Sequence, residues 1–343
     1  MASSATAEMM QFLSTSAKPN NLQGLVGIVG VFVLWACCFA AWQQPPGHVP
    51  MLFIPILLWL LLWHVYLGND VMVPALLGAA PAVCLLKMFP LSQLLQLGLV
   101  LLATAVAQRA YENLIHECSH YNAFATPSWN DGALANVAGS FVFKDIVGYR
   151  RSHQIHHAFF GITAKDPDAV IYDRAGSSDA NRVLATWYIE NVQSIRLRWC
   201  HLANAFLLLI VEAPYQAWGR AFLLWLTAYI ILLPGLRMVA EHAEHGGLVT
   251  SPTSWAAHRQ GRDQSEYQAQ HWTMTRSNVG TLHRWVFHPM NDGYHTLHHL
   301  YPKVPFHQLR QLHEELRNKS SEFPYWGVCK DLGLLNKDVQ AFF

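Results

Sequence analysis

The sequence predicts an all-α integral membrane protein in which about four to six transmembrane helices support a helical cap with a histidine-rich metal site. Two observations predict this fold class. The chain of 343 residues is 52% hydrophobic and only 13% charged, which is a low charged fraction for a soluble protein. Eight of its 19 histidines fall in three short motifs, HECSH at 116–120, HQIHH at 153–157 and HTLHH at 295–299.

The N-terminal third contains the first group of predicted membrane helices. Between Pro19 and Gln108 the only charged residues are Asp70 and Lys87. The apolar runs in this region are Leu25–Trp42, Met51–Leu67, Val71–Leu86 and Leu91–Ala107. A helix needs about 20 mostly apolar residues to span a bilayer. The first run meets this length, the second and fourth suffice with interfacial flanks, and two prolines interrupt the third. Either two or four spans are therefore expected here.

A second apolar region predicts a membrane hairpin. It covers Trp199–Leu236, and its only charged residues are Glu212 and Arg220. We expect two helical arms, Leu202–Ala213 and Trp218–Leu236, which turn near the proline at position 214. No part of the chain has the alternating pattern of a substantial β-sheet.

The chain is expected to form one domain. Residues 1–24 are a polar, Ser/Ala-rich tail without the basic start of a cleavable signal peptide. Residues 25–343 are the membrane domain, with membrane helices at about 25–115 and 202–237 and cytoplasmic segments at about 116–201 and 238–343. The six cysteines form no CxxC pair, so no structural disulfides are expected.

Lysine and arginine predict which side of the membrane carries the histidine motifs. Of the 23 residues of these two types, nine lie between Arg109 and Arg198 and eleven lie from Arg237 onward. The positive-inside rule places both segments in the cytoplasm. All three motifs lie in or beside these segments, so we expect the metal site on the cytoplasmic side of the membrane.

The spacing of the histidines predicts metal binding. On a helix, His116 and His120 project from one face one turn apart, and each HxxHH motif can aim three imidazoles at one spot. The candidate ligands are His116, His120, His153, His156, His157, His295, His298 and His299. A single metal cannot use eight imidazoles, so two metals are expected. Zinc, copper, iron and nickel all accept imidazole ligands.

The order of these motifs resembles the integral-membrane fatty acid desaturase superfamily. In both, an HxxxH motif precedes an HxxHH motif by about 30 residues, and a second HxxHH motif follows a membrane hairpin. The flanking residues agree with that superfamily in RRSHQIHHAFFGITAKDPD at 150–168, RMVAEHAEH at 237–245 and NDGYHTLHHLYPKVPFHQL at 291–309. The resemblance covers roughly residues 90–315.

This resemblance implies a non-haem di-iron centre held by about nine histidines. The ninth ligand that it implies is His242, with His245 as the alternative, and Asn291 is expected to reach an iron directly or through water. A ligating histidine usually gives its other N–H to a carboxylate or carbonyl. We expect that role for Asp166, Asp168, Glu241 and Asp292.

The resemblance also implies an O2-dependent oxidase that attacks an unactivated C–H bond of a fatty acyl or other lipid-like chain. Desaturation is the expected outcome, and hydroxylation or oxidative decarboxylation to a terminal alkene are the alternatives on the same scaffold. The chain lacks HPGG, GxGxxG and CxxC motifs, so electrons are expected from a separate ferredoxin, rubredoxin-like protein or cytochrome b5 with its reductase. Four arginines, Arg150, Arg151, Arg259 and Arg262, are interpreted first as positive-inside charges, with docking of an acidic donor as the alternative.

Three other classes of function fit the sequence less well. The lack of a basic patch interleaved with aromatic residues argues against nucleic-acid binding, and the net charge of +1 gives no indication of partners. A metal transporter would need ionisable residues inside the spans rather than beside them. A zinc-dependent hydrolase fits HECSH as an HExxH motif with Glu117 as the base, but the two later histidine motifs are then superfluous.

Overall fold

The computed structural model describes residues 18–43, 93–160, 165–168, 199–216, 219–245, 275–280, 283–319 and 329–330. These parts of the chain fold mainly into helices, as the sequence predicts. The apolar runs Met51–Leu67 and Val71–Leu86 lie outside the described residues, and so does most of the polar tail. The total number of spans and the division at residue 25 therefore stay predictions.

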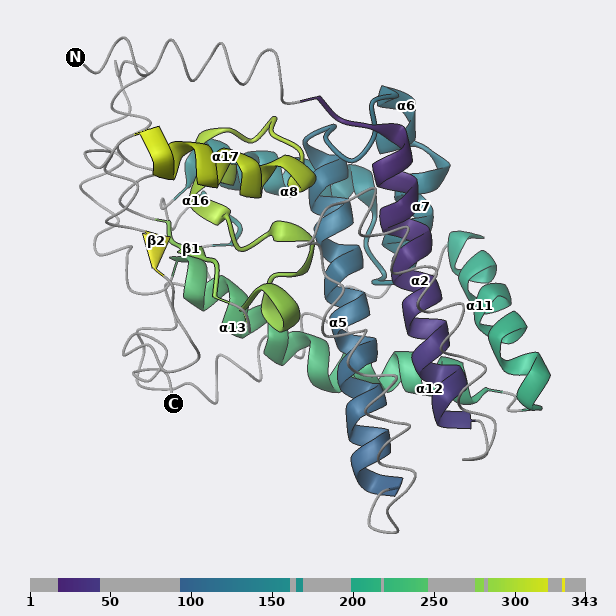
Figure 1. Cartoon of the computed structure of the whole chain (residues 1–343). Helices are drawn as coiled ribbons and strands as arrows, with labels where there is room; N and C mark the ends of the chain where they lie inside the picture. The colour runs from purple at the N-terminus through teal and green to yellow at the C-terminus, as the bar shows by residue number, and fades with distance from the viewer. Residues whose placement is uncertain are drawn as a thin grey trace.

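Two long helices, α2 (Asn21–Gln43) and α5 (Gln93–Ser119), pack side by side at the centre of the fold (Figure 1). The first predicted apolar run lies within α2, and residues 93–107 of the fourth run lie within α5. Buried polar side chains lock them together, because the Trp35 indole N–H donates to the Thr104 hydroxyl at 3.0 Å. The Tyr111 hydroxyl on α5 likewise donates to a backbone carbonyl of α2 at 3.0 Å.

The predicted hairpin is present. Its first arm is α11 (Trp199–Glu212), and the turn η3 (Ala213–Tyr215) contains the expected proline. Its second arm is one continuous helix made of α12 (Arg220–Thr227), the π-helical segment η4 (Ala228–Leu232) and α13 (Leu233–His245). This second arm extends beyond the predicted end at residue 236 and carries both histidines of the AEHAEH sequence.

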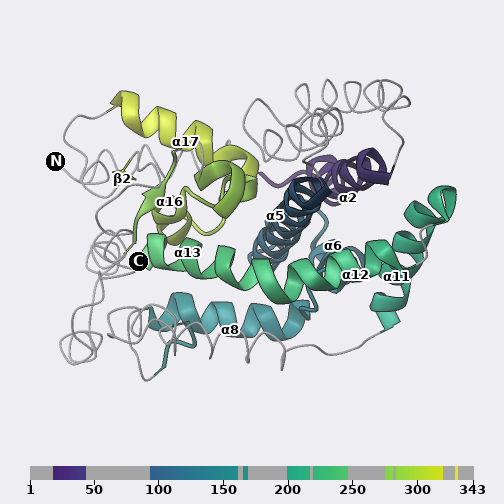
Figure 2. The same ribbon diagram turned by 90° about the horizontal axis from the view of Figure 1, so that it is seen from below.

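Three helices in the described part of the chain are long and apolar enough to cross a membrane: α2, α5 and the helix Arg220–His245. The 14 residues of α11 fall short of the roughly 20 that a span needs. Both arms of the hairpin nevertheless expose large apolar side chains, including Leu202, Phe206 and Leu223. Exposed apolar surface of this kind is typical of contact with lipid. Figures 1 and 2 show that the second arm crosses α5 rather than running along it.

The acidic residue of the predicted apolar region Trp199–Leu236 has a structural role. Glu212 is buried at the end of α11, and its carboxylate accepts hydrogen bonds from the backbone N–H groups of Gly219, Ala221 and Phe222. These are N–H groups at the start of α12, which have no partners within the helix itself. Glu212 therefore caps α12 and is not free to line an ion pathway.

We expect the substitution Glu212→Ala to lower the stability of the protein by about 1–3 kcal/mol, because buried N–H groups lose their acceptor. Thermal unfolding in detergent would measure this loss. Glu314→Ala is the matched control, since its pair with Arg310 at 3.8 Å is largely exposed and contributes about 0–1 kcal/mol. Equal unfolding temperatures for the two variants would contradict the capping role.

Three further helices follow α5: α6 (Pro127–Asp131), α7 (Ala133–Ser140) and α8 (Ile146–Phe159). Arg150 fastens α8 to the end of α5, because its guanidinium donates to the carbonyls of Ser119 at 3.1 Å and Cys118 at 2.7 Å. Arg150 also bonds to the Asn130 carbonyl and the Asp131 carboxylate. Arg150 therefore has a structural role, and the docking of an electron donor stays a prediction.

The C-terminal part is built from short elements. The strands β1 (Ser277–Asn278) and β2 (Cys329–Lys330) form a two-residue parallel pair. They are accompanied by η5 (His283–Phe287), η6 (Pro289–Asn291), α16 (His295–Leu300) and α17 (Phe306–Lys319). Before α16, Met290 and Asn291 both have positive φ angles, 63° and 61°. This left-handed backbone turns the chain sharply into the third histidine motif.

Candidate metal centre

The three histidine motifs lie on helices whose ends meet. The first motif ends α5, the second occupies the last turns of α8, and the third forms most of α16. Figure 1 shows α8, α16 and α17 gathered around the same end of α5. Seven of the eight motif histidines are buried, and His120 is half-buried.

Five imidazoles form a first group. Ring nitrogens of His116, His120, His153, His157 and His298 all lie within 4.8 Å of one another. The Nε2 atom of His153 is 2.8 Å from Nε2 of His120 and 3.0 Å from Nε2 of His157. The Nε2 atom of His157 is 3.2 Å from Nε2 of His298. This group therefore joins α5, α8 and α16 at one point.

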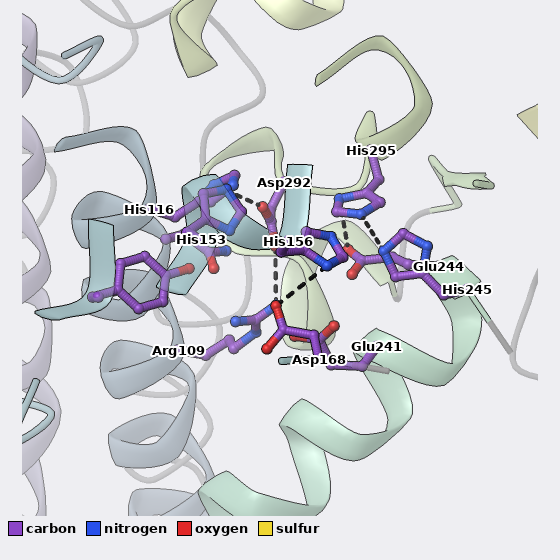
Figure 3. Close-up of a pocket in the computed structure, with 12 residues that line it drawn as sticks. Arg109, His116, His153, His156, Asp168, Glu241, Glu244, His245, Asp292 and His295 are labelled. Atoms are coloured by element: carbon purple, nitrogen blue, oxygen red, sulfur yellow. Dashed lines mark hydrogen bonds and ion pairs between the residues drawn. The ribbon is translucent and has the colours of Figure 1, made fainter. Parts of the chain in front are cut away.

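A second group contains four imidazoles. Ring nitrogens of His156, His245 and His299 lie within 4.8 Å of one another. The Nε2 atom of His295 joins them, at 2.8 Å from Nε2 of His245 and 3.0 Å from Nε2 of His299. Figure 3 shows His156, His245 and His295 approaching this point from three different elements.

The two triplets divide their histidines between the groups, so the expectation that each aims at one spot was wrong. In α8 the outer pair, His153 and His157, joins the first group and His156 joins the second. In α16 the outer pair joins the second group and His298 joins the first. Residues i and i+4 of a helix differ by about 40° in direction, whereas i+3 and i+4 differ by about 100°.

The spacing within each group suits a metal ion. Nitrogen ligands about 2.1 Å from a metal lie about 3.0–3.4 Å apart for angles between 90° and tetrahedral, close to the distances found here. Burial and the charges of His156 and Arg150 lower the pKa of His120 to about 3. Burial and the neighbouring imidazoles likewise lower the pKa of His153 well below its ordinary value. Both rings are therefore neutral at pH 7, as metal ligation requires.

Two carboxylates lie next to the Nδ1 atom of His156. Its Nδ1 atom lies 2.9 Å from Oδ1 of Asp166 and 3.5 Å from Oδ2 of Asp168. Burial alone lowers the pKa of His156, but the hydrogen bond and charge of Asp166 more than offset this and raise it to about 9. The Asp166 carboxylate thus holds a proton on Nδ1, and a metal would take the place of the proton on Nε2.

A chain of buried ion pairs begins at the Nδ1 atom of His116. Its Nδ1 atom is 3.5 Å from Oδ1 of Asp292, and Oδ2 of Asp292 accepts a hydrogen bond from Arg109 at 3.0 Å. The same guanidinium donates to the Phe287 carbonyl at 3.1 Å and pairs with Glu112. Figure 3 shows Asp292 between His116 and Arg109. Asp292 therefore lies where it can orient His116.

A small cavity opens between the two groups. Its volume is about 40 Å³, which suffices for one or a few water-sized molecules. Its walls include His116, His156 and His295, so it borders both groups. The predicted residues Asp168 and Glu241 also line it, close to each other in Figure 3.

Comparison with known proteins agrees with this geometry. The family model described as "Fatty acid desaturase" matches residues 92–328, more than half of the chain. The chain belongs to the fatty acid desaturase family. A protein of Oryza sativa subsp. japonica named "Sphingolipid delta(4)-desaturase DES1-like" is 25% identical over 244 residues, which is 66% of this chain and 67% of the rice protein. No solved structure matches the chain.

The resemblance that the sequence suggested is thereby confirmed, and the chain is an oxidoreductase of the membrane desaturase type. As expected for this family, its histidines are arranged so that they can hold metal. The family match begins at the start of α5 and includes all three histidine motifs.

For the ninth histidine of this desaturase, the geometry favours the alternative residue. His245 is buried and joins the second group, whereas His242 is half-buried and belongs to neither group. The three-residue step between them turns the helix by about 300°, so that the two rings point in different directions. Asn291 donates through Nδ2 to the Phe306 carbonyl at 3.0 Å, and its buried Oδ1 has no hydrogen-bond partner among the described residues.

The HExxH string does not have the geometry of a zinc hydrolase. Glu117 is buried, and its Oε2 accepts a hydrogen bond from the backbone N–H of Phe306 at 2.9 Å. Its other oxygen is 3.8 Å from Nδ1 of His116. Glu117 therefore anchors the start of α17 through a backbone hydrogen bond, which gives it a structural role.

Sequence reasoning missed Glu244. Its Oε1 lies 3.5 Å from Nδ1 of His295 and 3.1 Å from Nε2 of His288, a histidine outside the three motifs. The sequence does indicate it, because AEHAEH contains two Glu-His pairs, at 241–242 and 244–245. If His245 is the ligand, the preceding Glu244 is the carboxylate expected beside it.

Proposed function

We propose that the chain is a di-iron fatty acid desaturase. The first iron is held by His116, His120, His153, His157 and His298, and the second by His156, His245, His295 and His299. One observation carries the proposal: nine buried or half-buried imidazoles from four helices direct their ring nitrogens into two adjacent groups. Iron bound there would supply the activation of O2 that removal of hydrogen from an unactivated C–H bond needs.

The residues of the chain have distinct tasks in this proposal. Asp166 orients His156 by accepting from its Nδ1, and Asp292 lies 3.5 Å from Nδ1 of His116, where it can orient that ring. The burial of the histidines excludes bulk water, which limits side reactions. The cavity beside both groups is too small for a lipid headgroup, so it accommodates small molecules such as water or O2.

Desaturation of a fatty acyl or other lipid-like chain is the proposed reaction. Two hydrogens leave the chain, and with two electrons and two protons from a donor they reduce one O2 to two waters. The family and the rice desaturase both support this outcome over hydroxylation or oxidative decarboxylation to a terminal alkene. The electrons come from a separate ferredoxin, rubredoxin-like protein or cytochrome b5 with its reductase.

Expression of the chain together with such a donor system tests this function. Extracted lipids, free fatty acids and volatile hydrocarbons are profiled by mass spectrometry, with an iron-ligand variant as the negative control. We expect products two mass units lighter than their substrates. Products that gain one oxygen would identify a hydroxylase, and terminal alkenes one carbon shorter would identify a decarboxylase.

The proposed site faces the cytoplasm, and topology mapping tests this orientation. Tags inserted in the region 163–198, most of which lies outside the described residues, and at the C-terminus are both expected to be cytoplasmic. They fall in the two segments, Arg109–Arg198 and from Arg237 onward, that hold 20 of the 23 Lys and Arg residues. Proteases added to intact cells should leave both tags uncut, and inverted vesicles should expose both. Tags found on opposite sides of the membrane would refute this topology.

Glu117→Gln separates the oxidase from a zinc hydrolase. The glutamine side-chain oxygen still accepts from the Phe306 N–H, so we expect iron content and desaturation to stay within about threefold of wild type. A hydrolase that used Glu117 as its general base would lose at least about 100-fold in activity. Turnover assays and metal analysis of the purified variant give the answer.

A further inference from the structure

We propose that His288, which lies outside the three histidine motifs, is a positioning residue for the second iron. It acts through Glu244 on the ligand His295. This inference rests on the di-iron function proposed above, and it assigns a task to two buried histidines that the proposed reaction does not otherwise use.

The contacts form a chain that ends at the metal group. The Nε2 atom of His288 lies 3.1 Å from Oε1 of Glu244, and that oxygen lies 3.5 Å from Nδ1 of His295. His288 and Glu244 are 0% and 2% exposed, so neither is a surface group. Figure 3 shows Glu244 on α13 facing the imidazole of His295.

A π-helix brings a second imidazole to this chain. The backbone N–H of His288 donates to the carbonyl of His283 at 2.7 Å, which is the i to i+5 bond of the π-helical segment η5. This wider turn places the two side chains together, with their Nδ1 atoms 3.4 Å apart. Segments of this kind occur frequently at functional sites.

The carboxylate faces one nitrogen of each ring. Its Oε1 lies between Nε2 of His288 and Nδ1 of His295, so the position of one ring constrains the other through Glu244. The second nitrogen of His288, Nδ1, lies against Nδ1 of His283, which closes the far end of the chain.

The consequence for the metal follows from these contacts. A carboxylate beside one nitrogen of a ligating histidine orients its ring, and the opposite nitrogen of His295, Nε2, lies 2.8 Å from Nε2 of His245. His288 also lies against the carbonyl of Ala240 on α13, which keeps the ring beside Glu244. Without His288, the buried Glu244 loses the polar neighbour that holds it beside His295.

A comparison of full-length variants tests this assignment. His288→Leu removes both ring nitrogens, whereas His288→Gln keeps an amide N–H that can donate to Glu244. His313→Leu is the matched control, because His313 is also buried but lies beside Tyr294 and outside both metal groups. Iron per chain, the rate of iron release to a chelator and the Mössbauer spectrum are measured on each purified protein.

We expect His288→Leu to release one of its two irons about 10–100-fold faster than wild type, with the Mössbauer signal of only one iron altered. His288→Gln and His313→Leu should retain two irons with wild-type release rates. Two irons with unchanged release in His288→Leu would overturn the inference and leave the proposed function standing. Equal loss of both irons in His288→Leu and His288→Gln would mean a general structural role and would also overturn it. A wild-type protein that binds fewer than two metals would overturn the proposed function itself.

Discussion

Replacement of His298 by alanine is expected to abolish turnover and to lower the iron content by at least one ion per chain. His298 is the contribution of α16 to the first group, where its Nε2 lies 3.2 Å from Nε2 of His157. The remaining four imidazoles come from α5 and α8 alone. The alanine side chain has no ligand atom to replace the imidazole in this buried space. The first iron would therefore bind more weakly and with an incomplete coordination shell.

Metal analysis and product formation, measured on the same preparation, check this prediction. His307→Ala is a suitable control because His307 is half-buried on α17 and belongs to neither metal group. His156→Ala gives the complementary result, since it removes a nitrogen from the second group. Full turnover in both His156→Ala and His298→Ala, or in wild-type protein that carries only zinc, would refute the di-iron proposal.

The local parts of this structure could be predicted from sequence because they depend on neighbouring residues. The apolar run at Leu25–Trp42 is long enough for a membrane helix, and α2 covers it. The turn of the hairpin falls at the predicted proline within η3. The HxxxH spacing of the first motif likewise follows the helical period, and α5 carries His116 directly on from its apolar segment.

The parts that depend on packing could not be predicted in this way. Spacing alone places the histidines of α8 on a helix, but which metal group each one joins depends on how α5, α8 and α16 cross. The hydrogen bonds of Arg150 to the end of α5 were equally unpredictable, since a charge before a histidine motif resembles a surface residue in sequence. The pairing of His283 with His288 needs a π-helix, whose i to i+5 spacing lies outside the period that sequence patterns are tested against.

His245→Ala is expected to abolish activity, whereas His242→Ala should leave most of it. The Nε2 atom of His245 is 2.8 Å from Nε2 of His295, and its ring centroid is 5.2 Å from that of His299 and 5.5 Å from that of His156. His242 is half-buried on another face of α13 and reaches neither group. This expected result reverses the sequence prediction, which gave His242 as the ninth ligand and His245 as the alternative.

The size of the loss in activity distinguishes a residue that binds the metal from one that only orients a ligand. Loss of a residue that only orients a ligand typically costs about 10–100-fold in metal affinity or activity, and loss of a ligand should exceed that range. We therefore expect His245→Ala to lose one iron and more than about 100-fold in turnover, and His242→Ala to keep two irons and stay within about tenfold of wild type. Expression level and elution from a sizing column serve as controls for folding, because His245 lies in the last turn of α13.

If His242→Ala has the larger effect, the ninth ligand is His242 and α13 must be rotated relative to its position here. If activity survives the double substitution, α13 supplies no ligand, and the buried Oδ1 of Asn291 becomes the next candidate to complete the second group.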